Sequence, residues 1–595
     1  MCGIVGYVGY EQAAPILLSA LCNLQYRGYD SAGVALCTDD GVRMLKCVGS
    51  PEKLVSKLAS CADISSFCGV GHTRWATHGK PDIVNAHPHS CGRFYVVHNG
   101  IIENGEALKE EYFKNTEFIS QTDTEVIARL LQKFCENTAT IHEAIQCLIS
   151  ELRGSYAIGI VDSEAPDVLY AIKNKSPLLI GSGDGFNMLG SDAVAMISHT
   201  DRFYEICDRE YAVVKKDNFK IYSSTGKEVH RESFVVQCDL SACTKGNYAH
   251  YMLKEIEEQP QVIGRILSRY CDKNKNINID KEIISKLEEA DRIYIVASGT
   301  SYNAGLIGKC YFEKICSKPV DVCMAGEFIH NMPPLSQIPV FIFVSQSGET
   351  ADCIAALSKI KELGFTSMAI TNSELSTISR ESDHTLLIYA GVEIAVASTK
   401  SYTAQVAVFA LLALALNEKY AETIKRDLYR VADAMEKACD RREEYRIIAH
   451  KYLLNQQSCF YIGRGIDYYV SLEAALKLKE IAYIQTEGYA AGELKHGSIA
   501  LIEQDTPVIA FSTQKITCSH MRSNIEEVKA RGGKVFCISS CESDEGESMS
   551  VECVNELLSP LVSVIPAQYF AYYAALERGC DIDRPRNLAK AVTVE

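Results

Sequence analysis

The second residue of the chain combines two groups that can do chemistry together. The sequence begins Met1-Cys2-Gly3-Ile4-Val5-Gly6, so removal of the initiator methionine leaves a cysteine with a free α-amine. The amine titrates near ~8 and the thiol near ~8.5, so the amine can serve as the base for its own thiol. The alternative for Cys2 is a small apolar residue at the start of a buried strand, and its position alone favours that alternative.

Four more segments of the N-terminal part are rich in polar residues, and each by itself is typical of a capped turn. Together with Cys2 they resemble the glutamine amidotransferases of the N-terminal nucleophile hydrolase superfamily. The resemblance implies an αββα sandwich, in agreement with the α+β pattern of short apolar runs between helical stretches. The four segments are residues 26–33, 71–79, 85–88 and 98–100.

The resemblance implies a role for each matching residue in glutamine hydrolysis. Cys2 attacks the amide, and the Asn99 side chain and Gly100 N–H stabilise the oxyanion. Arg74 binds the α-carboxylate of glutamine, which a guanidinium can hold with two bonds, and Asp123 binds its ammonium group. The remaining glutamine-binding residues implied are Arg27, Trp75, Thr77 and His78.

Asp123 also lies at the start of a predicted helix. The pattern predicts a helix over 125–134, and residues 122–124 before it offer side chains that can cap its first turn.

Histidines are frequent in these segments, and not all of them need a catalytic role. We predict that His72, His87 and His98 make structural hydrogen bonds. For His78 a structural and a glutamine-binding role remain equally open. Trp75 is the only tryptophan of the chain and lies in a polar loop bounded by glycines, which favours a lid over a core position.

The rest of the chain contains an internal repeat with an offset of about 167 residues. Apolar runs at 293–296 and 339–344 are matched by runs at 460–462 and 507–511, each followed by a small or hydroxyl-rich loop. Strand–loop–helix units of this kind build doubly wound parallel sheets, in which ligands bind at the carboxyl ends of the strands. The pattern therefore predicts two α/β domains.

The loop Ser345-Gln346-Ser347-Gly348-Glu349-Thr350 lies between a predicted strand and a predicted helix. Hydroxyls and free N–H groups at the start of a helix suit a phosphate, whereas an ordinary cap needs only one hydroxyl. The Gly-Lys-Ser/Thr signature of a P-loop is missing, so no nucleoside triphosphate is implied. The duplicated unit resembles the sugar isomerase domain, which binds phosphosugars.

Further motifs extend the resemblance to the whole chain. They are 298–303, 393–400, 475–480, 492–497 and the C-terminal 584–595. All of them resemble the isomerizing glutamine–fructose-6-phosphate aminotransferases. An insertion found near residue 230 in many eukaryotic members is missing, which favours the bacterial type.

This second resemblance implies an isomerase and transferase site for fructose 6-phosphate. Lys590 forms a Schiff base with the ketose, Glu480 moves a proton between C1 and C2, and His496 of a neighbouring subunit helps to open the sugar ring. Lys477 is three residues before Glu480 and shares its helix face. The remaining sugar-phosphate-binding residues implied are Thr300, Ser301, Ser345, Gln346, Ser347, Thr350, Val396 and Ser398. Ser298 and Ser498 depart from residues common in the family.

From these features we predict three folded domains. They are a glutaminase domain at 2–237 and two sugar isomerase domains at 248–430 and 445–584. A linker at 238–247 follows the first domain, and a catalytic tail at 585–595 follows the last. The apolar run 406–416 is too short for a bilayer and is predicted to be a buried helix.

Composition limits the partners and the compartment. A net charge of −16 argues against nucleic acid, and the start of the chain lacks a secretion signal. Twenty-four scattered cysteines favour thiols in a reducing cytoplasm, and no spacing suits zinc. We expect a cytoplasmic homodimer that uses glutamine and fructose 6-phosphate and needs no metal or organic cofactor.

Two other functions share parts of this pattern. An amidotransferase for phosphoribosyl diphosphate would need paired acidic residues after a strand, and the sequence has none. A phosphosugar sensor without catalysis would not need Glu480, His496 and Lys590, which the chain retains.

Overall fold

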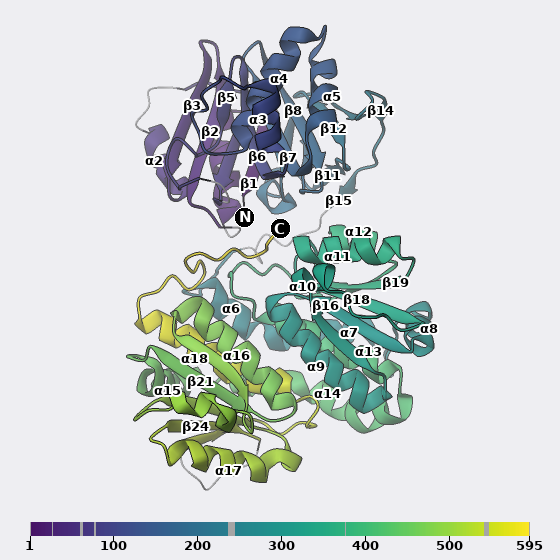
Figure 1. Cartoon of the computed structure of the whole chain (residues 1–595), viewed down its shortest axis with the longest axis vertical. Coiled ribbons are helices and arrows are strands. Elements are labelled where there is room, and N and C mark those ends of the chain that lie inside the picture. The colour runs from purple at the N-terminus through teal and green to yellow at the C-terminus, as the bar shows by residue number, and fades with distance from the viewer. Residues whose placement is uncertain are drawn as a thin grey trace. The chain divides into compact units, whose positions relative to one another are not determined.

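A computed structural model describes residues 2–25, 28–59, 64–76, 79–235, 244–374, 376–540 and 547–593 (Figure 1). The chain divides into two compact units. The first consists of Met1–Thr244 with Ala589–Val594, and the second is Lys245–Leu588.

The first unit contains two antiparallel sheets. In the described residues, one has the strand order β15-β11-β9-β10-β1-β4-β2-β3 and the other β14-β13-β12-β8-β7-β6-β5. The first sheet consists of β1 (Gly3–Gly9), β2 (Ser31–Thr38), β3 (Gly41–Val48), β4 (Cys68–Arg74), β9 (Leu179–Gly183), β10 (Phe186–Gly190), β11 (Arg202–Glu205) and β15 (Phe234–Val235). The second consists of β5 (His89–Cys91), β6 (Phe94–Ile102), β7 (Gly154–Asp162), β8 (Ala165–Asn174), β12 (Glu210–Val214), β13 (Phe219–Ser223) and β14 (Glu228–Val229).

Alternation along the strands explains the layers of this unit. In β1, Val5 and Tyr7 pack against α1, whereas Ile4 and Val8 face the other sheet. The outer face of the first sheet is covered by α1 (Ala13–Asn23) and α2 (Pro51–Ala59). The outer face of the second is covered by α3 (Gly105–Tyr112), α4 (Thr124–Asn137) and α5 (Ile141–Glu151). The unit is thus the αββα sandwich that the sequence predicted.

The second unit contains two parallel sheets with the same topology, in the orders β17-β16-β18-β19-β20 and β22-β21-β23-β24-β25 of the described residues. The first comprises β16 (Arg292–Ala297), β17 (Val320–Met324), β18 (Pro339–Ser345), β19 (Thr366–Thr371) and β20 (His384–Leu387). The second comprises β21 (Ser458–Gly463), β22 (Gln485–Ala490), β23 (Pro507–Ser512), β24 (Lys534–Ser539) and β25 (Glu547–Ser550). The predicted duplication is therefore confirmed in the fold.

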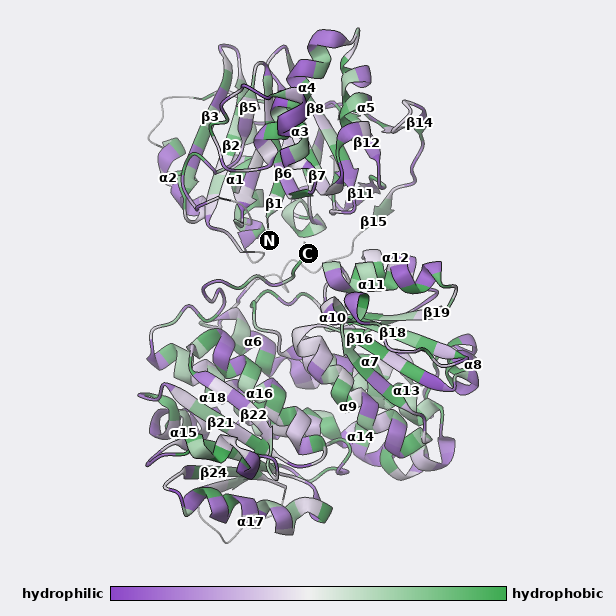
Figure 2. Ribbon diagram, in the orientation of Figure 1, coloured by the Kyte–Doolittle hydropathy of each residue, from purple (hydrophilic) through white to green (hydrophobic). Residues whose placement is uncertain are grey.

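Helices join the two halves of the second unit around one large apolar core. The predicted buried helix at 406–416 is confirmed within α13, which is buried along nearly its whole length and green in Figure 2. The helices are α6 (Tyr251–Glu257), α7 (Gln259–Tyr270), α8 (Lys281–Glu289), α9 (Gly299–Cys316), α10 (Ala325–His330), α11 (Ala351–Glu362), α12 (Thr377–Glu381), α13 (Lys400–Ala415), α14 (Glu418–Cys439), α15 (Arg442–Leu453), α16 (Ile466–Ala482), α17 (Cys518–Lys529) and α18 (Ser559–Glu577).

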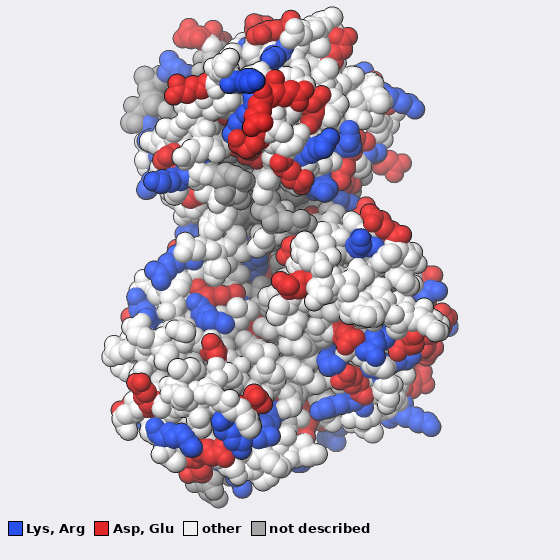
Figure 3. Space-filling view, viewed as in Figure 1, with Lys and Arg blue, Asp and Glu red and all other residues white. Residues whose placement is uncertain are grey.

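Three further features concern the surface charge, the helices and the groups that could bind a metal. Acidic and basic side chains are interspersed over the face drawn in Figure 3. In the described part of the chain, none of the helices has the length and apolar character that crossing a membrane requires. The described residues also contain no group of three His, Cys, Asp or Glu side chains arranged to hold a metal ion.

Replacement of Ile158 by alanine should destabilise the first unit. Ile158 lies in β7, is fully buried and packs in the core beneath α4 and α5. We expect a loss of about 2–5 kcal/mol in the free energy of unfolding, because a buried cavity remains. The matched control is Ile119→Ala, where the side chain is 79% exposed and a change within about 0.5 kcal/mol is expected. Urea unfolding checks both variants, and equal shifts would contradict the core assignment.

Candidate active sites

Cys2 lies immediately before β1, beside the backbone that follows β4. Its Sγ accepts a hydrogen bond from the Trp75 N–H at 3.2 Å and lies 3.5 Å from the Trp75 carbonyl oxygen. Burial raises the pKa of the thiol, while the Trp75 N–H and Arg74 act in the opposite direction. Cys2 as a residue is partly exposed.

His72 fixes the orientation of the Asn99 amide. His72 Nε2 lies 2.9 Å from the His98 carbonyl oxygen and 3.0 Å from Asn99 Oδ1. A carbonyl only accepts, so Nε2 carries the proton and donates, and the atom of Asn99 facing it must be oxygen. The Nδ2 group of Asn99 has no partner in the described chain, which leaves it available as a donor. Such a donor is what an oxyanion requires.

Buried histidines surround this bond, and all of them are neutral at physiological pH. Burial lowers the pKa of His72 and of His89 to about 3, and it also lowers those of His87 and His98. Thr124 links two of them, because its hydroxyl lies 2.7 Å from His87 Nε2 and 3.0 Å from His98 Nδ1. His72, His87 and His98 thus make the structural hydrogen bonds that the sequence predicted.

Arg74 and Asp123 are the charged pair that the sequence predicts to bind the two ends of an amino acid. Arg74 is buried at the end of β4 and donates to the carbonyl oxygens of Gly79 and Lys80 at 3.1 and 3.2 Å. Asp123 stands at the start of α4, but its side chain does not cap that helix. One oxygen instead accepts the Ile102 N–H at 2.8 Å, and the carboxylate remains partly exposed.

Gly100 needs to be a glycine for a backbone reason. It has φ = +128°, and a Cβ placed there would lie 1.9 Å from the Ser155 carbonyl oxygen. The neighbouring strand therefore excludes any side chain at this position. Of the other residues predicted to bind glutamine, Trp75 contacts Cys2 through its backbone, and Arg27, Thr77 and His78 lie outside the described residues.

The second candidate site is built around a buried lysine where the two halves of the second unit meet. Lys477 on α16 has its Nζ 2.6 Å from a Glu480 oxygen and 3.4 Å from Glu473 Oε1. It also donates to the Thr300 hydroxyl on α9 at 2.9 Å. Asn303, one turn further along α9, donates to Glu473 Oε2 at 2.8 Å.

Two carboxylates keep this lysine charged. Lys477 and Glu473 are fully buried, whereas the side chain of Glu480 is 20% exposed. Burial acts against the charge of Lys477, but Glu473 and Glu480 outweigh it and raise the pKa of the lysine. Burial raises the pKa of Glu473. Glu480 is the more exposed of the two carboxylates in this cluster.

The loop at residues 345–350 lies at the edge of the sheet that ligands favour. β16 and β18 are parallel neighbours. The strand order runs from β16 to β17 on one side and to β18 on the other, and ligands bind where the order of an α/β sheet changes direction in this way. The Ser345 hydroxyl bonds to the Thr350 hydroxyl at 2.8 Å and accepts the Gly348 N–H at 3.0 Å. The backbone N–H groups of Gln346, Ser347 and Thr350 have no partner in the described chain, so they are free for an anion.

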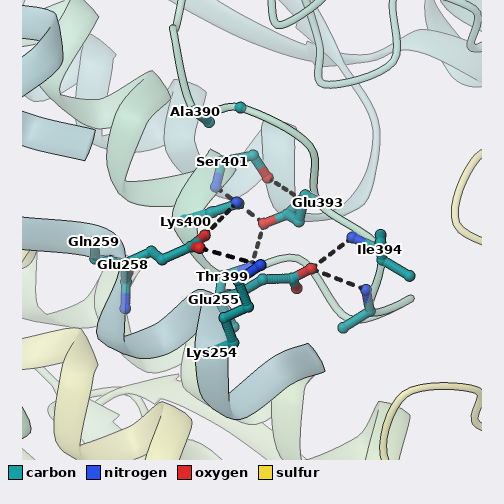
Figure 4. A network of polar contacts seen from close by, with 12 residues as sticks. Lys254, Glu255, Glu258, Gln259, Ala390, Glu393, Ile394, Thr399, Lys400 and Ser401 are labelled. Carbon is teal, nitrogen blue, oxygen red and sulfur yellow. Dashed lines mark hydrogen bonds and ion pairs between the residues drawn. The ribbon is translucent and has the colours of Figure 1, made fainter. Parts of the chain in front are cut away.

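Carboxylates hold the backbone of the segment 393–401, which Figure 4 shows from close by. Glu255 on α6 accepts the N–H groups of Ile394 and Ala395, at 2.5 and 3.2 Å. Glu393 accepts the N–H groups of Thr399 and Ser401, at 3.0 and 3.1 Å.

The same network reaches the end of the second unit. The Val396 N–H donates to the Asp583 carbonyl oxygen at 3.0 Å. The Asp583 carboxylate accepts the Tyr251 and Met252 N–H groups, both at 2.9 Å. Val396 itself is buried, and Ser398 two residues further on is partly exposed.

The remaining predicted residues are Ser301, His496 and Lys590. Ser301 is buried, and its hydroxyl accepts a hydrogen bond from the Gln405 side chain at 3.0 Å. His496 ends a short 3₁₀ turn at Leu494–His496 and is exposed. Lys590 is partly exposed and belongs to the segment Ala589–Val594 of the first unit.

Sequence reasoning missed several residues that hold these sites. Glu473, Glu255 and Asp583 were not singled out, although each is a carboxylate with buried donors around it. The signal for Glu473 was present, because it precedes Lys477 by one helical turn. For Glu255 and Asp583 the sequence offers no comparable signal.

Comparison with known proteins places these sites in a family. A model of the glutamine amidotransferase domain matches residues 82–198, and a model of the SIS domain matches residues 286–415 and 452–578. A glutamine–fructose-6-phosphate aminotransferase [isomerizing] of Geobacillus kaustophilus is 52% identical, and one of Staphylococcus aureus is 51% identical. Both alignments cover all of this chain and all of the relative.

Solved structures agree for the second unit. The C-terminal domain of glucosamine-fructose-6-phosphate aminotransferase from Francisella tularensis aligns with 57% of this chain and 99% of its own, at 34% identity and a TM-score of 0.55. Tagatose-6-phosphate ketose/aldose isomerase from Escherichia coli, 19% identical, shares the fold over 56% of this chain and 96% of its own, with a TM-score of 0.50. With half of its residues identical to these relatives over the full length, the chain belongs to the family of isomerizing glutamine–fructose-6-phosphate aminotransferases.

Proposed function

We propose that the protein makes D-glucosamine 6-phosphate and L-glutamate from D-fructose 6-phosphate and L-glutamine. The proposal rests on 52% identity, over the full length of both chains, with a glutamine–fructose-6-phosphate aminotransferase [isomerizing]. The chain also has both a Cys2 site and a Lys477–Glu480 site. Formation of both products from the two substrates tests it. Glutamate without amino sugar would reduce the protein to a glutaminase, and sugar binding without turnover would favour a sensor.

Glutamine hydrolysis uses the first site. Cys2 attacks the amide carbon, and its own α-amine receives the thiol proton and passes it to the leaving ammonia. The oxyanion is met by the Asn99 Nδ2 group, which His72 turns away from its own ring, and by Gly100. Arg74 and Asp123 hold the two charged groups of the amino acid. From the sequence we propose that Thr77, His78 and Arg27 also bind glutamine.

Sugar chemistry uses the second site. Lys590 condenses with C2 of the open-chain ketose, and a phosphate on the sugar takes the free N–H groups and hydroxyls of the loop 345–350. Glu480 carries the proton between C1 and C2, while Lys477 holds that carboxylate from the buried side. Ammonia must arrive unprotonated, because ammonium has no lone pair with which to attack the carbon.

We also propose a cytoplasmic homodimer. His496 is exposed and its side chain has no partner in the described chain, which suits a residue that acts in the site of a neighbouring subunit. The described cysteines are thiols, the state that a reducing compartment maintains.

Cys2→Ala should abolish glutamine-dependent synthesis and leave binding of fructose 6-phosphate intact, because only the nucleophile is lost. The matched control is Cys22→Ala, which removes another partly buried thiol of the first unit. Product assays and calorimetry with the sugar give the two readouts. Mass spectrometry of the active protein should show that Met1 is removed, and an active protein that retains or acetylates it would refute the nucleophile assignment.

Lys590→Arg should retain the positive charge but lose covalent capture of the sugar. With fructose 6-phosphate and borohydride, the wild type should gain the mass of the reduced adduct at Lys590, since an imine is reduced to a stable amine. Lys529→Arg, on α17, is the control and should be labelled like the wild type. Trapping of the sugar on another lysine of the Lys590→Arg protein would move the Schiff base elsewhere.

His72→Ala should lower kcat for glutamine hydrolysis by about 10–100-fold with little change in KM, because Asn99 loses the bond that orients its amide. His72→Gln, whose amide can donate a hydrogen bond, should recover part of the rate. Binding of fructose 6-phosphate serves as the internal control. Two results would show that His72 does not position Asn99. One is a change in KM alone, and the other is a His72→Gln variant whose rate is no higher than that of His72→Ala.

A further inference from the structure

The duplicated fold repeats the geometry of the phosphate loop in its second half. β18 and β23 end at Ser345 and Ser512, and α9 and α16 begin at Gly299 and Ile466. Each pair is separated by about 167 residues. In this alignment Thr300 corresponds to Asp467. Because β18 begins at Pro339 and β23 at Pro507, Ser345 corresponds to Thr513, and the loop at 345–350 corresponds to 513–518.

A carboxylate of the chain occupies the second loop. Asp467 is fully buried, its Oδ2 accepts the Thr513 N–H at 2.7 Å, and its Oδ1 accepts the Thr513 hydroxyl at 2.5 Å. The carboxylate also accepts the Gln514 N–H, whereas the corresponding N–H of Gln346 in the first half has no partner in the described chain. The same donor is therefore free in one half and engaged by an anion in the other.

The other donors of the second loop are also engaged. The Gln514 side chain donates to the Glu556 carbonyl oxygen at 2.9 Å and to the Ser559 hydroxyl at 3.1 Å. The Lys515 N–H donates to Glu556 Oε1 at 3.1 Å. Gln514 and Lys515 thus bond to the chain itself rather than to a ligand.

The two halves also differ in the charge that an anion would meet. In the first half, the hydroxyl of Thr300 receives a bond from the positively charged Lys477. In the second half, burial raises the pKa of Asp467 to about 6, against the effect of Thr513, so the group is ionised at neutral pH. A phosphate there would meet a fixed negative charge at close range.

We propose that Asp467 fills the second phosphate position with a carboxylate of the protein itself, so that each chain takes one phosphosugar, in its first half. This proposal rests on the proposed function for the identity of the sugar, but the anion count it predicts does not depend on turnover. Asp467 thereby determines the stoichiometry of binding, and it does so without contacting the substrate.

Equilibrium dialysis with inorganic phosphate tests the proposal through a gain of binding. The wild type should bind one phosphate per chain, and Asp467→Thr, which restores the residue of the first half, should bind two. Ser347→Ala combined with Asp467→Thr should weaken the first site at least tenfold and retain the second. Asp433→Thr, an exposed position on α14, is the matched control and should bind one.

Two results would overturn the proposal. One is two phosphates per wild-type chain, and the other is a single phosphate bound to an Asp467→Thr protein that still makes glucosamine 6-phosphate and is therefore folded. Should that variant not fold, wild-type crystals soaked in selenate provide the test instead. Anomalous density beside Ser347 with none beside Thr513 supports the proposal, and density beside Thr513 refutes it.

Discussion

The second unit of this protein depends on one buried charge, the ammonium group of Lys477. It lies where α16 of one half meets α9 of the other, and it contacts Glu473, Glu480 and Thr300 together. Removing one partner of such a cluster leaves an uncompensated buried charge, which costs about 3–5 kcal/mol. The same contacts that join the two halves therefore also set the position of Glu480.

A similar principle holds the segment 393–401. Its amide groups are held by Glu255, Glu393 and the Asp583 carbonyl oxygen rather than by a neighbouring strand. Asp583 also binds the first amides of α6, so the beginning and the end of the second unit meet at one residue. A backbone ordered in advance loses little conformational entropy when a ligand binds.

Much of this could be predicted from the sequence because the motifs are local. The strand-to-helix loop at 345–350 and the repeat with its offset are visible in residue order, as is the cysteine at position 2. The position of Asp123 before a helix was also visible, but the expected cap was wrong, because its carboxylate binds the Ile102 N–H of another element.

What could not be predicted are contacts between distant elements. Glu473 meets Asn303 across 170 residues, and Tyr251 meets Asp583 across 332. His72 looked like one of several structural histidines, and only its shared bond to a carbonyl oxygen and Asn99 reveals which way the amide points. Such roles follow from tertiary packing and not from spacing along the chain.

The bond between Trp75 and Cys2 gives the protein a built-in optical reporter. Trp75 is the only tryptophan among 595 residues, it is partly exposed, and its backbone touches the sulfur of Cys2. Indole fluorescence excited apart from tyrosine therefore arises from this one location. Its intensity and wavelength report, without an attached dye, on the surroundings of the ring of the residue whose N–H binds Cys2.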